Sequence, residues 1–111
     1  MMDIYLDLAP YLARRGFAAT RILAGATEFK RERDRKTLYL KNTNRLCLAV
    51  HPDDIAAPYN VGGRFGYELF NPSFVAFPLK KNNGPAQFGI AFDLEDAEDG
   101  DYILSKLYRE S

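Results

Sequence analysis

Residues 36–51 have the sequence KTLYLKNTNRLCLAVH, which holds two short runs of alternating residue types. In the first run, 36–41, leucines occupy every second position. The second run, 46–51, repeats the alternation after an asparagine-rich break at 42–45. A period of two in both runs, with a short turn between them, predicts two antiparallel strands that bury one face.

Three more strands are predicted around this pair. One lies before it, at 21–31, and is joined to it by the polar turn Glu32–Arg35. The stretch 52–72 is irregular and rich in Gly and Pro, and a loop this long is often functional. After it, Phe74–Phe77 and Phe88–Phe92 predict two short strands.

Helices are predicted at both ends of the chain. Apolar residues recur at spacings of three and four over 3–15, where Gly16 is expected to end the helix and Pro10 to kink it or delay its start. The second helix is predicted at about 95–108, after several carboxylates that suit the positive end of a helix dipole. Gly100 is expected to weaken its first turns and to delay its start.

The predicted order is α-β-β-β-loop-β-β-α, which indicates an α+β fold. We expect a single domain over 1–111, with a mostly antiparallel sheet of about five strands and an N-terminal and a C-terminal helix. The 111 residues are 47% hydrophobic, which is enough for a core. The sequence contains no run of about 18 apolar residues, so no membrane-spanning helix is predicted. A single cysteine, Cys47, favours the reducing cytoplasm.

Several segments of the chain resemble a known family. They are Arg15-Gly16-Phe17, Glu28-Phe29-Lys30-Arg31, Leu38-Tyr39-Leu40-Lys41-Asn42, Leu48-Ala49-Val50-His51-Pro52, Phe77-Pro78-Leu79, Phe88-Gly89-Ile90 and the final helix to Tyr108. With these segments the chain resembles the small uncharacterised bacterial cytoplasmic proteins typified by enterobacterial YgaC. The resemblance covers most of the chain but does not extend over residues 53–73. It implies a small α+β domain in the bacterial cytoplasm and implies no catalytic residue.

The charges of the chain are divided between its two halves. The formal net charge is zero. Residues 1–50 hold ten Lys and Arg against five Asp and Glu, and residues 51–111 hold the reverse. Neutrality excludes a globally basic nucleic-acid binder but leaves room for a locally basic surface.

The strongest functional signal is a basic cluster around the turn predicted at 32–35. Its members are Lys30, Arg31, Arg33, Arg35, Lys36, Lys41 and Arg45, with Tyr39 among them. The cluster predicts that the hairpin at about 28–45 contacts an acidic protein surface or a second copy of the chain, through a segment such as 93–101. The alternative is a nucleic-acid module, in which the cations track phosphates and Tyr39 stacks on a base. The cluster is also explained without a partner if its cations form ion pairs within the hairpin, because acidic residues interleave with the basic ones.

A second alternative is a small hydrolase-like enzyme centred on His51, the only histidine. It places His51, Asp53 and Asp54 at the mouth of the loop 53–73 and requires a pocket there, lined by Tyr59, Arg64 and Tyr67. A structural His51 is favoured, because catalytic metal sites take three protein ligands at fixed spacing. The glycine cluster 62–66 lacks the ending of a phosphate-binding loop. We therefore expect a binding domain rather than an enzyme, without a catalytic residue, metal, cofactor or membrane partner.

Overall fold

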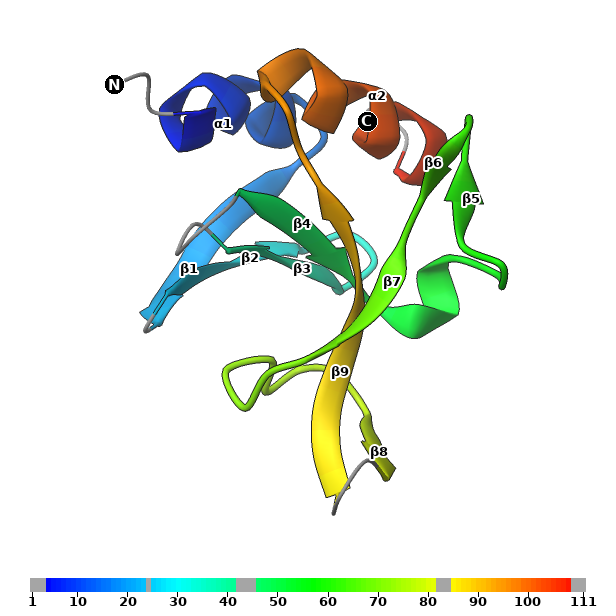
Figure 1. The fold of residues 1–111 in the computed structure, drawn as a ribbon. Helices are drawn as coiled ribbons and strands as arrows, with labels where there is room; N and C mark the ends of the chain where they lie inside the picture. Colours follow the sequence, from blue (N-terminus) through cyan, green and yellow to red (C-terminus); the bar gives the residue numbers. More distant parts are fainter. Residues whose placement is uncertain (1–3, 24, 42–45, 82–84, 109–111) are drawn as a thin grey trace.

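The computed structural model of the chain describes residues 4–23, 25–41, 46–81 and 85–108 (Figure 1). The helices and strands along these residues follow an order close to the one predicted. The elements are α1 (Ile4–Arg14), β1 (Phe17–Leu23), β2 (Ala26–Arg31), β3 (Lys36–Lys41), β4 (Cys47–Val50), the 3₁₀ helix η1 (Pro52–Asp54), β5 (Asn60–Val61), β6 (Arg64–Phe65), β7 (Tyr67–Phe70), β8 (Leu79–Lys81), β9 (Pro85–Asp93) and α2 (Ala97–Leu107).

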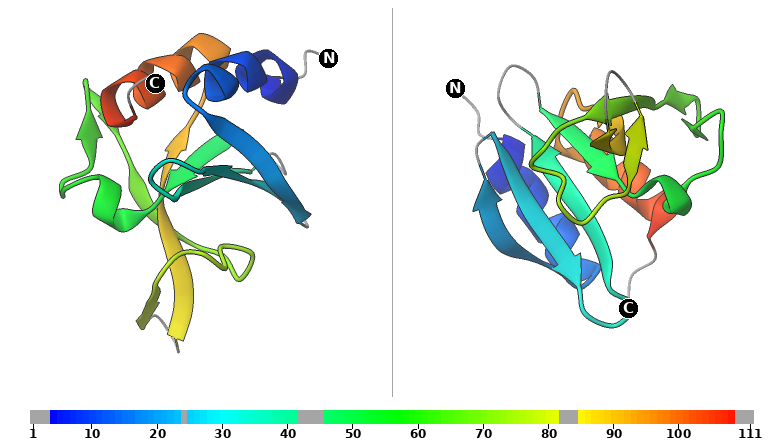
Figure 2. Two further views of the ribbon diagram at one scale, coloured as in Figure 1. Left: turned by 180° about the vertical axis from the view of Figure 1, so that it is seen from behind. Right: turned by 90° about the horizontal axis from the view of Figure 1, so that it is seen from below.

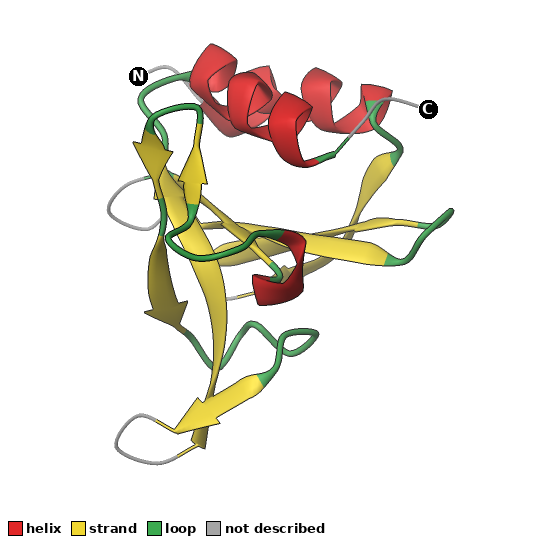
Figure 3. Ribbon diagram, turned by 90° about the vertical axis from the view of Figure 1, so that its right-hand side faces the viewer, coloured by secondary structure: helices red, strands yellow, loops and turns green. Residues whose placement is uncertain are grey.

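Two helices lie on one face of an antiparallel sheet. The sheet has seven strands in the order β1-β2-β3-β4-β9-β7, with β8 also paired to β9. Helices α1 and α2 lie side by side over the same face (Figures 2 and 3). The first part of β9 and β8 extend away from the helices. The predicted α+β class, with a helix at each end of a mostly antiparallel sheet, is confirmed.

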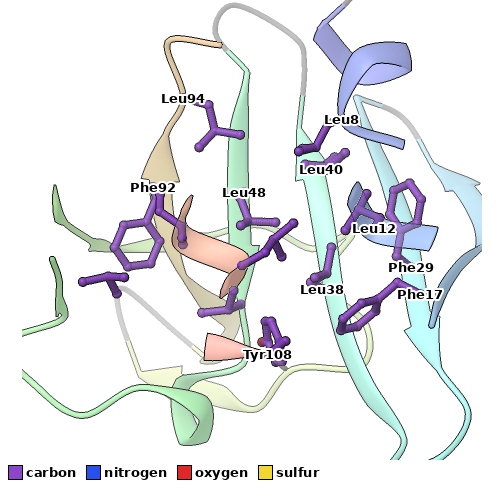
Figure 4. Packing of buried hydrophobic residues seen from close by; sticks show 14 of the residues in the cluster. Leu8, Leu12, Phe17, Phe29, Leu38, Leu40, Leu48, Phe92, Leu94 and Tyr108 are labelled. Atoms are coloured by element: carbon purple, nitrogen blue, oxygen red, sulfur yellow. The ribbon is translucent and has the colours of Figure 1, made fainter. Parts of the chain in front are cut away.

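The helix-covered face of the sheet holds the larger core. Leu38 and Leu40 of β3 and Leu48 of β4 are buried in one cluster with Leu12 of α1 and Tyr108 at the end of α2 (Figure 4). Each fully buried leucine contributes about 1.5–3 kcal/mol through removal of its side chain from water. The alternation within 36–41 and 46–51 therefore correctly predicts an antiparallel strand pair, but β3 and β4 are buried on both faces and not on one.

The opposite face is covered by a loop. Tyr39 and Ala49 point to this side and pack with Phe74 and Phe77. The expected strand at Phe74–Phe77 is wrong: Phe74 N donates to Asn71 O and Phe77 N to Phe74 O, both at 3.0 Å, which makes two turns. In a strand, residues three apart point to opposite faces, whereas here both rings fill the space over Tyr39.

The expected strand at 21–31 is two strands of a hairpin. β1 begins at Phe17, before the predicted start, and pairs with β2 in antiparallel register. Gly25 has φ of 75°, the left-handed conformation that a tight reversal requires. The only signal for this reversal was one glycine among alanines, so the predicted three-stranded meander has four strands, β1 to β4.

The irregular stretch 52–72 contains regular structure. It includes η1, the hairpin of β5 and β6, and β7, which pairs with β9. Its glycines allow tight reversals: Gly62 and Gly63 have φ of 55° and 89° between β5 and β6. β5 and β6 form a separate two-stranded sheet, whereas β7 joins the main sheet beside β9. The main sheet has seven strands and not five because it gains β7, β8 and a second strand within 17–31, and lacks the strand expected at 74–77.

Each helix tests a prediction made at one residue. Helix α1 runs from Ile4 through Pro10, so the delayed start is excluded, and it is followed by Gly16, whose φ of 85° matches the predicted stop. Helix α2 starts before Gly100, not after it, because the Asp96 side chain accepts a hydrogen bond from Asp99 N and caps the helix. A Cβ at Gly100 would lie 2.8 Å from Leu8 Cδ1, so this glycine allows α1 and α2 to pack closely.

Candidate binding surface at the β2–β3 turn

The turn between β2 and β3 places basic side chains at one end of the sheet. Arg31 pairs with Lys36 across the hairpin, and the four residues 32–35 connect them. Arg35 has φ of 59°, in the left-handed region that glycine occupies more readily. We define the basic turn as Lys30, Arg31, Arg33, Arg35 and Lys36.

Two adjoining hollows lie against the basic turn. The large hollow has a volume of about 820 Å³, and the small hollow about 320 Å³. The large hollow is lined by Lys30, Arg31, Glu32, Arg33, Arg35, Thr37 and Ala76. The small hollow is lined by Asp34, Arg35, Lys36, Thr37, His51, Asp53, Asp54 and Ala76. Because three lining residues are shared, the two hollows meet at Arg35, Thr37 and Ala76.

Three cations of the basic turn are exposed to solvent. Lys30, Arg33 and Arg35 line the large hollow, and Glu32 is the acidic side chain on the same wall. Lys30 Nζ lies 3.9 Å from Glu28 Oε1. Exposed cations at this density form a local positive surface, which attracts carboxylates or phosphates.

Arg31 has a structural role within the same turn. It is 4% exposed, and its guanidinium lies over the rings of Phe17 and Tyr108. Its Nε and Nη2 donate to the two carboxylate oxygens of Asp34, at 3.1 and 2.7 Å, and Nη1 donates to Arg15 O at 3.3 Å. Arg31 therefore anchors the turn to α1 and α2.

Lys36 is also tied to the body of the protein. Its Nζ donates to Asp54 Oδ1 at 2.7 Å, and Tyr108 Oη donates to Asp54 Oδ2 at 2.6 Å. The hydrogen bond with Asp54 and the charge of that carboxylate raise the pKa of Lys36. Burial, followed by the charge of Asp54, raises the pKa of Tyr108 well above its usual value. Through Asp54, these hydrogen bonds join Lys36 of the basic turn to η1 and to the end of α2.

Tyr39 does not reach the surface that the nucleic-acid hypothesis needs. Its ring is 0% exposed and packs between Phe74 and Phe77. Its hydroxyl donates to Glu28 Oε2 at 2.6 Å and accepts from Ala76 N at 3.1 Å. Tyr39 therefore positions Ala76, a wall of both hollows, and its ring is not available for stacking on a base.

Glu28 is the buried carboxylate that anchors this wall. It is 1% exposed and accepts hydrogen bonds from Thr20, Arg21 and Tyr39. Burial opposes its ionisation, but the hydrogen bonds from Arg21, Tyr39 and Thr20 outweigh burial and lower its pKa to about 2. Glu28 is therefore a charged anchor at neutral pH. Burial, and then the hydrogen bond to Glu28, raises the pKa of Tyr39 to about 12.

Of the two remaining members of the predicted basic cluster, Lys41 lies away from the turn, and Arg45 is not among the residues that the structure describes. Lys41 ends β3 opposite Ala26. It lies five positions after Lys36, which is about 17 Å along a strand. Arg45 and the turn at 42–45 lie outside the described residues. The cluster that is continuous in sequence is thus divided in space, and the basic turn is its larger part.

The residues of the enzyme hypothesis lie at two different places. His51 lines the small hollow, where its Nδ1 accepts a hydrogen bond from Asp53 N at 3.0 Å and caps η1. Asp54 accepts hydrogen bonds from Lys36 and Tyr108. Arg64 instead donates to Asp99 Oδ1 at 2.6 Å, near the start of α2. The structure thus does not bring Arg64 to His51 around one pocket.

Two further observations bear on catalysis. Within residues 4–23, 25–41, 46–81 and 85–108, no three His, Cys, Asp or Glu side chains form a group that could hold a metal ion. Cys47 is buried in β4, and burial, followed by the charge of Asp93, raises the pKa of its thiol to about 11. A thiol with that pKa is a poor nucleophile.

The acidic segment that precedes and begins α2 is far from the basic turn. Figure 2 shows the turn, in cyan, beside the red end of α2 and away from its orange start. The contact of Arg31 with the Tyr108 ring fixes the turn at that end. Helix α2 has 11 residues and is about 16 Å long. The acidic segment therefore does not neutralise the basic turn within one molecule.

Comparison of the chain with protein-family models, with curated proteins and with solved structures finds no match. The resemblance to the YgaC-type family thus stays a prediction. Neither described α-helix is long and apolar enough to cross a membrane.

Sequence reasoning missed several residues that shape this surface. Thr37 and Ala76 line both hollows, and Tyr108 supports the turn from below. Ala76 and Tyr108 are distant from 32–35 in the sequence, so no local pattern could assign them. A partial signal existed for Thr37, which is directly opposite Lys30 in the predicted hairpin.

Proposed function

We propose that this chain is a non-enzymatic binding domain that holds an acidic protein segment against its basic turn. The observation that carries the proposal is the large hollow of about 820 Å³ with the exposed cations Lys30, Arg33 and Arg35 on its wall. Carboxylates of a partner suit these side chains, since arginine binds a carboxylate through two parallel hydrogen bonds. The family resemblance and the single cysteine support a location in the bacterial cytoplasm for this contact.

The conformation of Arg35 supports a role for its side chain. A residue other than glycine costs roughly 1–2 kcal/mol in the left-handed region. Arg35 occupies that region with φ of 59° on an exposed turn, where its side chain contributes no core packing. Strain of this kind is often retained where the side chain is used, which favours a contact made by the guanidinium of Arg35.

An acidic protein segment fits the basic turn better than a nucleic acid does. Glu32, Asp34 and Asp54 lie among the cations and would repel a continuous row of phosphates. Tyr39, the ring expected to stack on bases, is buried. A protein segment can place single carboxylates at the cations and neutral groups elsewhere.

Binding of a labelled glutamate-rich peptide to the purified protein tests the proposal. We expect the Arg33→Ala/Arg35→Ala variant to bind the peptide about tenfold more weakly, because each exposed ion pair contributes about 0.2–1 kcal/mol. The matched control, Lys80→Ala/Lys106→Ala, removes two exposed cations outside the turn and should bind like the wild type.

Two results would overturn the proposal. One is equal loss of peptide binding in the control variant and the turn variant, which would indicate attraction by net charge alone. The other is a preference for mixed-sequence DNA or RNA over the peptide at the same salt concentration, which would favour the nucleic-acid alternative.

A further inference from the structure

A third hollow, with negatively charged residues around it, lies at the start of α2. Its volume is about 410 Å³, and its lining residues are Arg64, Asp93, Leu94 and Glu95. Tyr67 stands beside it, 42% exposed, and donates from its hydroxyl to Asp93 Oδ1 at 2.7 Å. We call this place the acidic hollow.

The acidic hollow lies in the most negative part of the chain. The segment 93–101 carries Asp93, Glu95, Asp96, Glu98, Asp99 and Asp101. Arg64 forms an ion pair with Asp99, and Arg15 and Arg14 form ion pairs with Asp101. Arg14, Arg15 and Arg64 are thus engaged in ion pairs with two of these carboxylates. Glu95, Asp96 and Glu98 are exposed around the hollow. The surface is therefore left with an excess of negative charge.

We infer that the acidic hollow of one copy of this chain receives the basic turn of another copy. This inference rests on the proposed function and names its partner. Arginine side chains of the turn fit the hollow in two ways: they can form ion pairs with Glu95 and Glu98, and they can lie against the exposed ring of Tyr67. The two surfaces thus carry complementary charges in one polypeptide.

The contact forms between copies because it cannot form within one. The basic turn lies at the end of α2, where Arg31 contacts Tyr108, and the acidic hollow lies at its start, where Arg64 contacts Asp99. The helix holds them about 16 Å apart. Since the two surfaces differ, the contact is heterologous, and each added copy presents the same pair of surfaces again.

Sedimentation of the wild type and two variants tests this inference. The wild type should associate with rising concentration at about 20 mM salt and become monomeric at about 500 mM, because salt screens ion pairs. Arg33→Ala/Arg35→Ala disables the turn and Glu95→Gln/Glu98→Gln disables the hollow, so each variant alone should stay monomeric at low salt. The control Lys80→Ala/Lys106→Ala should associate like the wild type.

Mixing the two variants gives the sharpest result. The first keeps an intact hollow and the second an intact turn, so an equimolar mixture should form a one-to-one complex. A variant with all four changes, mixed with the turn variant, should leave both monomeric. A wild type that is monomeric at low salt, or a mixture that stays monomeric, overturns the inference. If that protein still binds the glutamate-rich peptide through its turn, the proposed function stands, and if it does not, both fail.

Discussion

The basic turn and the start of α2 are two charged regions of opposite sign that use their charges differently. At the start of α2, Asp96 caps the helix and Asp99 pairs with Arg64. In the basic turn, Arg31 and Lys36 are tied to the body of the protein, while Arg33 and Arg35 are exposed on the wall of a hollow. A run of like charges in a sequence therefore mixes structural with surface residues. A buried partner from another element identifies the structural ones.

The largest expected effect separates these roles within the turn. Arg31→Ala should lower the free energy of unfolding by about 2–4 kcal/mol, because it leaves Asp34 without its bidentate partner and removes packing from Phe17 and Tyr108. Arg33→Ala should change it by less than about 0.5 kcal/mol. Urea unfolding of both variants measures the difference. Equal losses would contradict the assignment of Arg31 to structure and Arg33 to the surface.

The next effect concerns Glu28, which anchors the wall of the hollow through Tyr39. Glu28→Gln should lower the free energy of unfolding by about 1.5–3 kcal/mol, because hydrogen bonds to a charged group are lost inside the protein.

The contribution of Glu28 also depends on pH. Its pKa is lowered from 4.5 to about 2 in the folded protein, so the unfolded chain takes up this proton first as pH falls. The contribution is complete above about pH 4.5 and is lost as the pH falls toward 2. Stability measured across this range should fall more steeply in the wild type than in Glu28→Gln. Parallel curves would show that Glu28 is not the group that titrates.

A smaller effect is expected at the acidic end. Asp96→Ala should lower the free energy of unfolding by about 1 kcal/mol, since Asp99 N loses the oxygen that caps α2. Asp96→Asn should restore most of the loss, because its amide oxygen also caps helices. Thermal or urea unfolding measures both. If Asp96→Asn were as unstable as Asp96→Ala, charge rather than capping would explain the role of Asp96.

The sequence predicted best what depends on local periodicity. The alternation around Leu38 and Leu48 correctly indicated a buried strand pair, and Gly16 correctly marked the end of α1. Local patterns failed where a distant contact decides the structure. Gly100 weakens an isolated helix, but in the protein it allows α1 to approach α2. Phe74 and Phe77 have strand propensity, but their rings pack together over Tyr39.

The candidate surface was predicted in part. The basic residues around 32–35 were evident from the chain, because they are consecutive or nearly so. Which of them point outward was not, since that depends on Asp54, Phe17 and Tyr108 in other elements. Ala76 lines both hollows, and the hydrogen bond from its N to Tyr39 Oη joins residues 37 positions apart. No sequence pattern encodes a contact over that separation.

The central claim is that the exposed side chains of the basic turn bind an acidic partner, and Arg35→Gly tests it most directly. Glycine adopts the φ of 59° without strain, so the variant should gain about 0.5–1 kcal/mol in the free energy of unfolding. The same change removes one cation from the large hollow, so the affinity for the glutamate-rich peptide should fall about threefold. Unfolding and binding are measured on the same protein. A variant that is more stable and binds more weakly is the predicted result, and one that is more stable but binds as tightly as the wild type would contradict the claim.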